Sequence, residues 1–177
     1  MKIGIIIGSI REGRRGGTIG DWVAGAAAAR TDATWELIDL KAFDVPLMTS
    51  AVHPMMARKK YDSPQIQRWS EAIDSCDGFV FVTAEYNHSV PGAFKNAVDV
   101  LGSEWMGKPV GFVSYGSAGG HRAVEHWRGV LANFSMDAQR AQVALYQGID
   151  YDAEFTPLER RARELTALFD AVVKAAN

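Results

Sequence analysis

The chain has little of several features that mark large classes of proteins. It has one cysteine among its 177 residues, Cys76, which excludes an intramolecular disulfide and any metal site built from several cysteines. Its formal net charge is only −2, a balance that does not favour a protein that coats nucleic acid or anionic membranes. No apolar run approaches the ~20 residues that cross a bilayer. We therefore expect a soluble, cytoplasmic protein without nucleic-acid or membrane partners.

What is present is the composition of an ordinary globular protein. Hydrophobic residues make up 47% of the chain and charged residues 23%, so wholesale disorder is not expected. A length of 177 residues suits one domain of ordinary size. No repeat, low-complexity tract or linker divides the chain, and we expect a single domain over residues 1–177.

Short apolar runs alternate with longer amphipathic ones. Five runs are typical of strands: Lys2–Gly8, Thr34–Leu40, Gly78–Thr83, Pro109–Tyr115 and a weaker one within Met136–Val143. The first is apolar on both faces, as in a parallel strand that helices cover on each side. This alternation predicts an α/β three-layer sandwich with a parallel sheet, for which the flavodoxin-like order 2-1-3-4-5 is the commonest arrangement of five strands.

Three segments repeat apolar residues at helical spacing and predict helices whose buried faces we can name. They are Ile66, Trp69, Ile73 and Cys76; then Val124, Trp127, Leu131 and Phe134; and then Leu158, Ala162, Leu165, Phe169 and Val172, with Pro157 in the first turn. One long stretch, Lys41–Ser63, has no clear period. It is either functional or part of an oligomer interface, or else a surface excursion with a short helix around Met55–Lys60.

The loop after the first predicted strand has the composition of an anion site. Residues 8–19 hold four glycines, two hydroxyl side chains and three arginines between a strand and a helix. Free amides, the positive end of a helix dipole and guanidinium groups together bind phosphate. Because ligands of open parallel sheets bind beyond the carboxyl ends of the strands, this loop is the first candidate site.

The spelling of this loop excludes two common phosphate-binding motifs. Gly8 and Gly13 have Walker A spacing, but Arg14 and Arg15 replace its lysine and hydroxyl residue. Ile10 occupies the second glycine position of a dinucleotide fingerprint. What remains is a mononucleotide phosphate held without a metal ion, or else a glycine-rich turn with exposed arginines.

Two later loops join the same predicted edge and complete a family resemblance. The chain resembles the NADPH-dependent FMN reductase family, flavodoxin-like flavoproteins that include quinone, azo-dye and chromate reductases. Three family signatures carry this resemblance: G-S-x-R, E-Y-N followed by P-x-x-L-K-N-A, and S-Y-G. They match Gly8–Arg11, then Glu85–Asn87 with Pro91–Ala97, and then Ser114–Gly116.

The chain departs from the family at Ala84 and Phe94, where proline and leucine are usual. The missing proline bears on redox tuning more than on flavin binding, and Phe94 is expected in the core.

The resemblance implies which residues would contact FMN. Those around its phosphate would be Ser9, Arg11, Arg15, Gly16, Gly17, Thr18 and Ile19, with Arg14 either exposed or near a nicotinamide-nucleotide phosphate. Those around the isoalloxazine would be Ala84, Glu85, Tyr86 and Asn87 on one side and Ser114, Tyr115 and Gly116 on the other.

The resemblance also implies an activity. The protein would pass hydride from NADPH or NADH to FMN, and electrons on to a small-molecule acceptor such as free flavin, quinone, azo dye or metal oxyanion, by a ping-pong mechanism. Because the flavin carries the chemistry, no catalytic side chain and no metal are expected. A homodimer or homotetramer is implied as well. The alternatives are a flavodoxin-type electron carrier and a flavin-free interaction domain.

Overall fold

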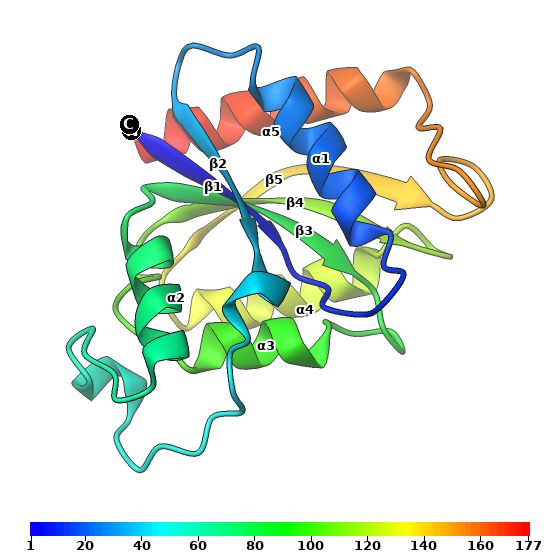
Figure 1. The fold of residues 1–177 in the computed structure, drawn as a ribbon. Helices are drawn as coiled ribbons and strands as arrows, with labels where there is room; N and C mark the ends of the chain where they lie inside the picture. The colour runs from blue at the N-terminus through cyan, green and yellow to red at the C-terminus, as the bar shows by residue number, and fades with distance from the viewer.

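The computed structural model describes residues 1–177 and contains one parallel sheet between two helical layers (Figure 1). The sheet has five strands in the order 2-1-3-4-5, and every neighbouring pair is parallel. Across the sheet the strands are β2 (Thr34–Asp39), β1 (Lys2–Ile7), β3 (Gly78–Ala84), β4 (Pro109–Gly116) and β5 (Asp137–Tyr146). This order confirms the predicted flavodoxin-like α/β sandwich.

Helices cover both faces of the sheet (Figure 1). On one face lie α1 (Gly16–Ala27) and α5 (Arg160–Ala176), and on the other lie α2 (Pro64–Asp74), α3 (Gly92–Asp99) and α4 (His121–Ala132). The α2–α4 face holds the larger hydrophobic cluster, whose fully buried aromatic side chains include Trp69, Trp105 and Trp127. Phe94 is fully buried there, as expected.

The start of α2 illustrates how local sequence defines these elements. The Ser63 hydroxyl accepts a hydrogen bond from the Ile66 amide at 3.3 Å, and Pro64 occupies the first helical position, where its missing N–H costs nothing. Trp69 and Ile73 then form the buried face. Cys76 follows the helix end and is buried as well.

The last helix begins later than the sequence pattern predicts. It starts at Arg160, so Pro157 lies in the preceding loop and the expectation of a first-turn proline is wrong. Leu158 is 40% exposed and belongs to that loop, where its amide donates to the Asp150 carboxylate. The buried face includes a charged residue, Arg161, which hydropathy alone does not place in a core. β5 also continues beyond the expected Val143, to Tyr146.

The irregular stretch Lys41–Ser63 contains 3-10 turns but no α-helix. One such turn covers Leu40–Phe43 and another covers Pro54–Met56, where a short helix around Met55–Lys60 was one of the two expectations. Asn96 of α3 ties the segment down, since its side chain donates to the Pro46 carbonyl and accepts from the Met48 amide, both at 2.9 Å. None of the helices combines the length and apolar character needed to cross a membrane.

Candidate functional site

The carboxyl ends of the strands surround a cavity of about 610 Å³. Loops that follow β1, β3, β4 and β5 line it, as expected of an open parallel sheet. Seven of the residues that the resemblance implies as FMN contacts line this cavity: Arg11, Arg15, Ala84, Glu85, Tyr86, Tyr115 and Gly116. The structure therefore brings the three loops of the family resemblance to one place.

The N-terminus of α1 offers free amides at this place. Its first intrahelical hydrogen bond runs from the Ile19 amide to the Arg15 carbonyl at 3.1 Å, and Arg15 provides no side-chain cap. The amides of Gly16, Gly17 and Thr18 therefore have no acceptor within the helix. The Ile19 amide already donates to the Arg15 carbonyl, and the Ile19 side chain lies in the core. Ile19 therefore has no free group to offer the phosphate that it was expected to contact.

A buried hydroxyl group points at this helix end. Tyr115 is 6% exposed, and its hydroxyl has no hydrogen-bond partner in the chain. A Cβ atom at Gly16 would lie 2.7 Å from that hydroxyl oxygen, so this close approach requires glycine. Burial raises the pKa of Tyr115, so the phenol stays protonated and remains a donor. A buried donor without an acceptor beside free amides fits an anionic ligand.

The three arginines of the first loop differ in what they bind. Arg14 donates to the Ser9 carbonyl at 2.5 Å and pairs with both carboxylate oxygens of Asp39, so it is not the free, exposed side chain that was one of the two expectations. It also lines the cavity, and its role near a nicotinamide-nucleotide phosphate stays a prediction. Arg15 donates to the carbonyl of Asp152. Arg11 lines the cavity and pairs with no acidic side chain, which leaves its charge available to a ligand.

Ser9 and Tyr86 form the floor between the first and third strands. Ser9 is 1% exposed, and its hydroxyl oxygen lies 2.6 Å from the Tyr86 hydroxyl oxygen, within hydrogen-bonding distance. Ser9 does not itself line the cavity but contacts Tyr86, which does. This contact links two loops that are 77 residues apart in the sequence.

Glu85 uses its side chain to hold α4. Its carboxylate accepts from the Arg122 amide at 3.0 Å and from the Arg122 guanidinium at 2.7 Å. Burial by itself raises the pKa of Glu85, but these hydrogen bonds outweigh it and lower the pKa overall. The carboxylate is therefore ionised and already paired, so only the rest of Glu85 remains to contact a ligand.

A tight turn follows Glu85. Asn87 and His88 have φ angles of 50° and 64°, and the flanking Tyr86 and Ser89 exchange both backbone hydrogen bonds. Asparagine tolerates this left-handed conformation better than most residues. Asn87 is exposed and does not line the cavity.

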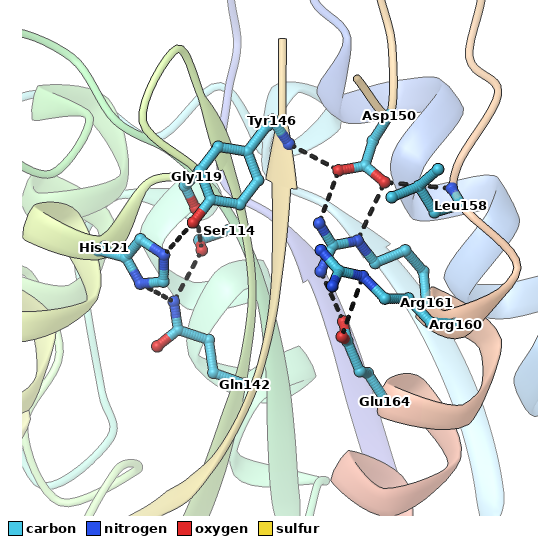
Figure 2. A network of polar contacts seen from close by, with 10 residues as sticks. All are labelled: Ser114, Gly119, His121, Gln142, Tyr146, Asp150, Leu158, Arg160, Arg161 and Glu164. Atoms are coloured by element: carbon cyan, nitrogen blue, oxygen red, sulfur yellow. Dashed lines mark hydrogen bonds and ion pairs between the residues drawn. The ribbon is translucent and has the colours of Figure 1, made fainter. Parts of the chain in front are cut away.

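Ser114 also serves the protein itself. Its hydroxyl donates to the Gly119 carbonyl at 2.6 Å and accepts from Gln142 at 3.1 Å (Figure 2). It thereby stabilises the turn that presents Gly116 to the cavity.

Sequence reasoning missed one wall of the cavity. Gln147, Tyr151, Asp152 and Ala153 line it from the segment after β5. Because β5 is parallel to the other strands, its carboxyl end had to reach the same edge. The position of this carboxyl end could have indicated the wall from the sequence. It was not recognised, because the strand was expected to end near Val143. Gly13, Arg14 and Ser117 complete the lining. No group of three or more His, Cys, Asp or Glu side chains in the chain is arranged to hold a metal ion.

Comparisons with known proteins agree with this geometry. Residues 1–150 match the family model described as NADPH-dependent FMN reductase. The chain belongs to this family. An NAD(P)H-dependent FMN reductase of Schizosaccharomyces pombe is 33% identical over 96% of this chain and 91% of its own length. The quinone reductase of Escherichia coli K12 is 30% identical over 74% of this chain and 69% of its own.

A third relative in the family matches over a shorter span. The NAD(P)H-dependent FMN reductase ntnL of Nectria is 41% identical over 69% of this chain, and the match spans 63% of that relative, less than two thirds of its length. Among solved structures, the flavoenzyme FerB of Paracoccus denitrificans superposes with a TM-score of 0.76 over 99% of this chain and 96% of its own, at 21% identity. Flavodoxin 1 of Bacillus cereus superposes over 98% of both chains with a TM-score of 0.59, at 16% identity. The predicted family and fold are confirmed.

Proposed function

We propose that this chain is an NAD(P)H-dependent FMN-binding oxidoreductase of the FMN reductase and quinone reductase class, formed as one domain over residues 1–177. Family membership and the names of the relatives support FMN as the cofactor and NAD(P)H as the donor. The observation that carries the proposal is the buried Tyr115 hydroxyl, which lacks a partner and faces the free N-terminus of α1. It supports a site at which an anionic group of the cofactor would complete the protein's own hydrogen bonding.

The phosphate of FMN would bind at this helix end. The amides of Gly16, Gly17 and Thr18 would donate to it, and the Tyr115 hydroxyl would supply a further hydrogen bond. Arg11 would contribute an unpaired positive charge. Arg15 would lie beside the phosphate, and Ser9 would support it from below through the Tyr86 hydroxyl.

The isoalloxazine would lie between the loops after β3 and β4. Ala84, Glu85 and Tyr86 would border one side, largely through backbone groups, since the Glu85 carboxylate is already paired with Arg122. Asn87 would act from outside the cavity, in the turn that presents Tyr86. Tyr115 and Gly116 would border the other side, with Ser114 holding their turn. When bound, FMN accepts hydride from NAD(P)H and passes electrons to a second acceptor. The protein would position the donor and acceptor in turn at one open cavity.

An anaerobic titration of the FMN-loaded protein with NADPH tests this function. We expect the long-wavelength flavin absorbance to bleach and to return when a quinone is added. Flavin that binds but stays oxidised would identify an electron carrier instead. Absence of flavin binding would overturn the site as a whole.

Arg11→Ala tests the phosphate contact directly. We expect it to weaken FMN affinity by about 1.5–3 kcal/mol, the scale of a hydrogen bond to a charged group. Titration of flavin fluorescence measures the dissociation constant. Arg68→Ala, which removes an exposed arginine from α2, is the matched control and should leave FMN affinity unchanged. Equal affinities of wild type and Arg11→Ala would remove Arg11 from the site.

We also propose a cytoplasmic homodimer or homotetramer that buries part of the Lys41–Ser63 segment. In the free chain this segment exposes Leu47 at 76%, Met56 at 69% and Val52 at 56%. It also encloses a cavity of about 480 Å³. Exposed apolar clusters of this kind mark interaction surfaces. Sedimentation of wild type and of Met56→Glu would test the assembly, and a monomeric wild type would overturn it.

A further inference from the structure

The segment after β5 reaches the cavity without regular structure of its own. We call residues 147–159 the β5 loop; it lies between β5 and α5. Gln147, Tyr151, Asp152 and Ala153 of this loop line the cavity. A wall made of irregular chain needs an anchor if it is to hold one geometry.

A buried carboxylate provides that anchor (Figure 2). The Asp150 side chain is 0% exposed, and each of its oxygens accepts two hydrogen bonds. Oδ1 accepts from the Leu158 amide at 3.1 Å and from Arg161 Nε at 2.9 Å. Oδ2 accepts from the Tyr146 amide and from Arg161 Nη2, both at 2.9 Å. One side chain thus ties the end of β5, the end of the β5 loop and α5 together.

Arg161 is the other half of the anchor. It lies in the first turn of α5, and its side chain is only 4% exposed. Its remaining nitrogen donates to Glu164 at 2.8 Å, so the guanidinium is held on both sides. Arginine in this bidentate geometry fixes position as well as charge. Arg161 itself does not line the cavity.

The anchored loop acts on the phosphate end of the cavity. The residue two positions after Asp150, Asp152, accepts a hydrogen bond at its carbonyl from the Arg15 guanidinium. Between them, Tyr151 is 6% exposed and packs edge-on against Tyr115, with the ring centroids 6.3 Å apart. The β5 loop therefore contacts both Arg15 and the tyrosine that faces the N-terminus of α1.

We propose that the Asp150–Arg161 ion pair is a positioning device for phosphate recognition: it holds the β5 loop so that Asp152 orients Arg15 and Tyr151 supports Tyr115. This inference rests on the proposed function. Its consequence is a preference for flavin that carries a phosphate over flavin that lacks one. Arg161 is a positioning residue that acts through Arg15 rather than on the ligand.

Arg161→Lys tests the proposal, because it keeps the charge but loses the bidentate geometry. Titrations with FMN and with riboflavin, which has no phosphate, give two dissociation constants for each variant. We expect the FMN constant to rise about tenfold, which is within the range of a charged hydrogen bond, and the riboflavin constant to change less than about twofold. The control is Arg160→Lys at the neighbouring exposed arginine, which should change neither constant.

A second pair of variants tests whether Arg161 acts through Arg15. Arg15 precedes α1 as its N-cap and is half-buried beside the cavity, and Arg15→Gln should by itself reduce the preference for FMN over riboflavin. In that background, Arg161→Lys should add little, because interacting positions are not additive. Arg15→Gln also keeps the test decisive if Arg161→Lys does not fold, since an unchanged preference in this variant alone would overturn the device.

The outcomes separate the inference from the function. A wild type that binds neither flavin would overturn the proposed function. A wild type that prefers FMN, with Arg161→Lys weakening both flavins equally, would leave the function standing and reduce the ion pair to a structural role.

Discussion

Two long irregular segments of this fold each contact a fully buried acidic side chain, and the two side chains differ in the donors from which they accept hydrogen bonds. Asp150 and Glu104 are both 0% exposed. Asp150 anchors the β5 loop through a guanidinium and two amides. Glu104 anchors the Lys41–Ser63 segment with neutral donors: the Tyr61 and Ser70 hydroxyls at 2.7 Å and the Gly102 amide at 2.9 Å.

The comparison teaches that the same kind of anchor can depend on different partners. The Asp150 site concentrates its stabilisation in one cation, so loss of that cation leaves a buried charge uncompensated. The Glu104 site distributes it over several dipoles, each of which can be removed singly at lower cost. Asp150 and Tyr61, which donates to Glu104, have pKa values shifted in opposite directions and should respond to opposite ends of the pH scale.

Arg161→Met should have the largest effect. It leaves Asp150 buried without its cation, and the expected loss is about 3–5 kcal/mol of unfolding free energy. Urea denaturation at neutral pH measures it. A loss below about 1 kcal/mol, the scale of an exposed pair, would mean that water reaches the site and that the contrast with Glu104 is false.

Tyr61→Phe should have the next largest effect. It removes one of three donors to Glu104, and we expect a loss of about 1–3 kcal/mol. The same urea titration measures it beside Arg161→Met. If Tyr61→Phe proves as costly as Arg161→Met, the idea that neutral donors share the charge of Glu104 is wrong.

The acid side of the pH profile should report on Asp150. Burial by itself raises the pKa of Asp150, but the hydrogen bonds from Arg161, Tyr146 and Leu158 lower it overall. Its contribution to stability is therefore present above its unfolded pKa of ~3.9 and is lost as pH falls through the lower folded value. Unfolding free energies of wild type and Asp150→Asn, measured from pH 7 downward, should begin to converge only below about pH 4.

The alkaline side should report on Tyr61. Burial, together with the neighbouring Glu104, raises the pKa of Tyr61 in the folded protein. Its contribution is fully present below the unfolded value of ~10 and is lost as pH rises towards the folded value. Tyr61→Phe should lack this part of the alkaline loss, whereas Asp150→Asn should retain it. Parallel profiles for all three proteins would contradict the contrast.

Arg160→Met should have the smallest effect. Its side chain is 58% exposed and lies 3.8 Å from Glu164, so we expect a change of about 0.5 kcal/mol or less. Comparison with Arg161→Met distinguishes the loss of a buried ion pair from the loss of any arginine of α5. A loss as large as that of Arg161→Met would assign the effect to α5 rather than to Asp150.

Much of the fold follows from local pattern. Apolar runs such as Lys2–Ile7 and Gly78–Ala84 identify strands, because a parallel strand covered on both faces must be apolar throughout. Helical spacing identifies Trp69 and Ile73 as a buried face in the same way. The start of α5 escaped this reasoning, since Leu158 fits an apolar pattern but belongs to a loop that Asp150 holds.

The features of the candidate site also separate into those that follow from local sequence and those that depend on the folded structure. By itself the sequence determined the strands, most of the helices and the glycine-rich first loop, because periodicity and motif spacing are properties of neighbouring residues. The strand order was predicted as the commonest arrangement of five parallel strands, and that order brings the three loops to one edge. Only the tertiary structure decided which charged side chains are already paired within the protein and which remain free to bind a ligand. Arg14 pairs with Asp39, 25 residues away, Glu85 with Arg122, 37 away, and Asp150 with Arg161, 11 away. Such pairings depend on distances in the folded chain, and for Asp150 and Arg161, which are both buried, each charge requires the other.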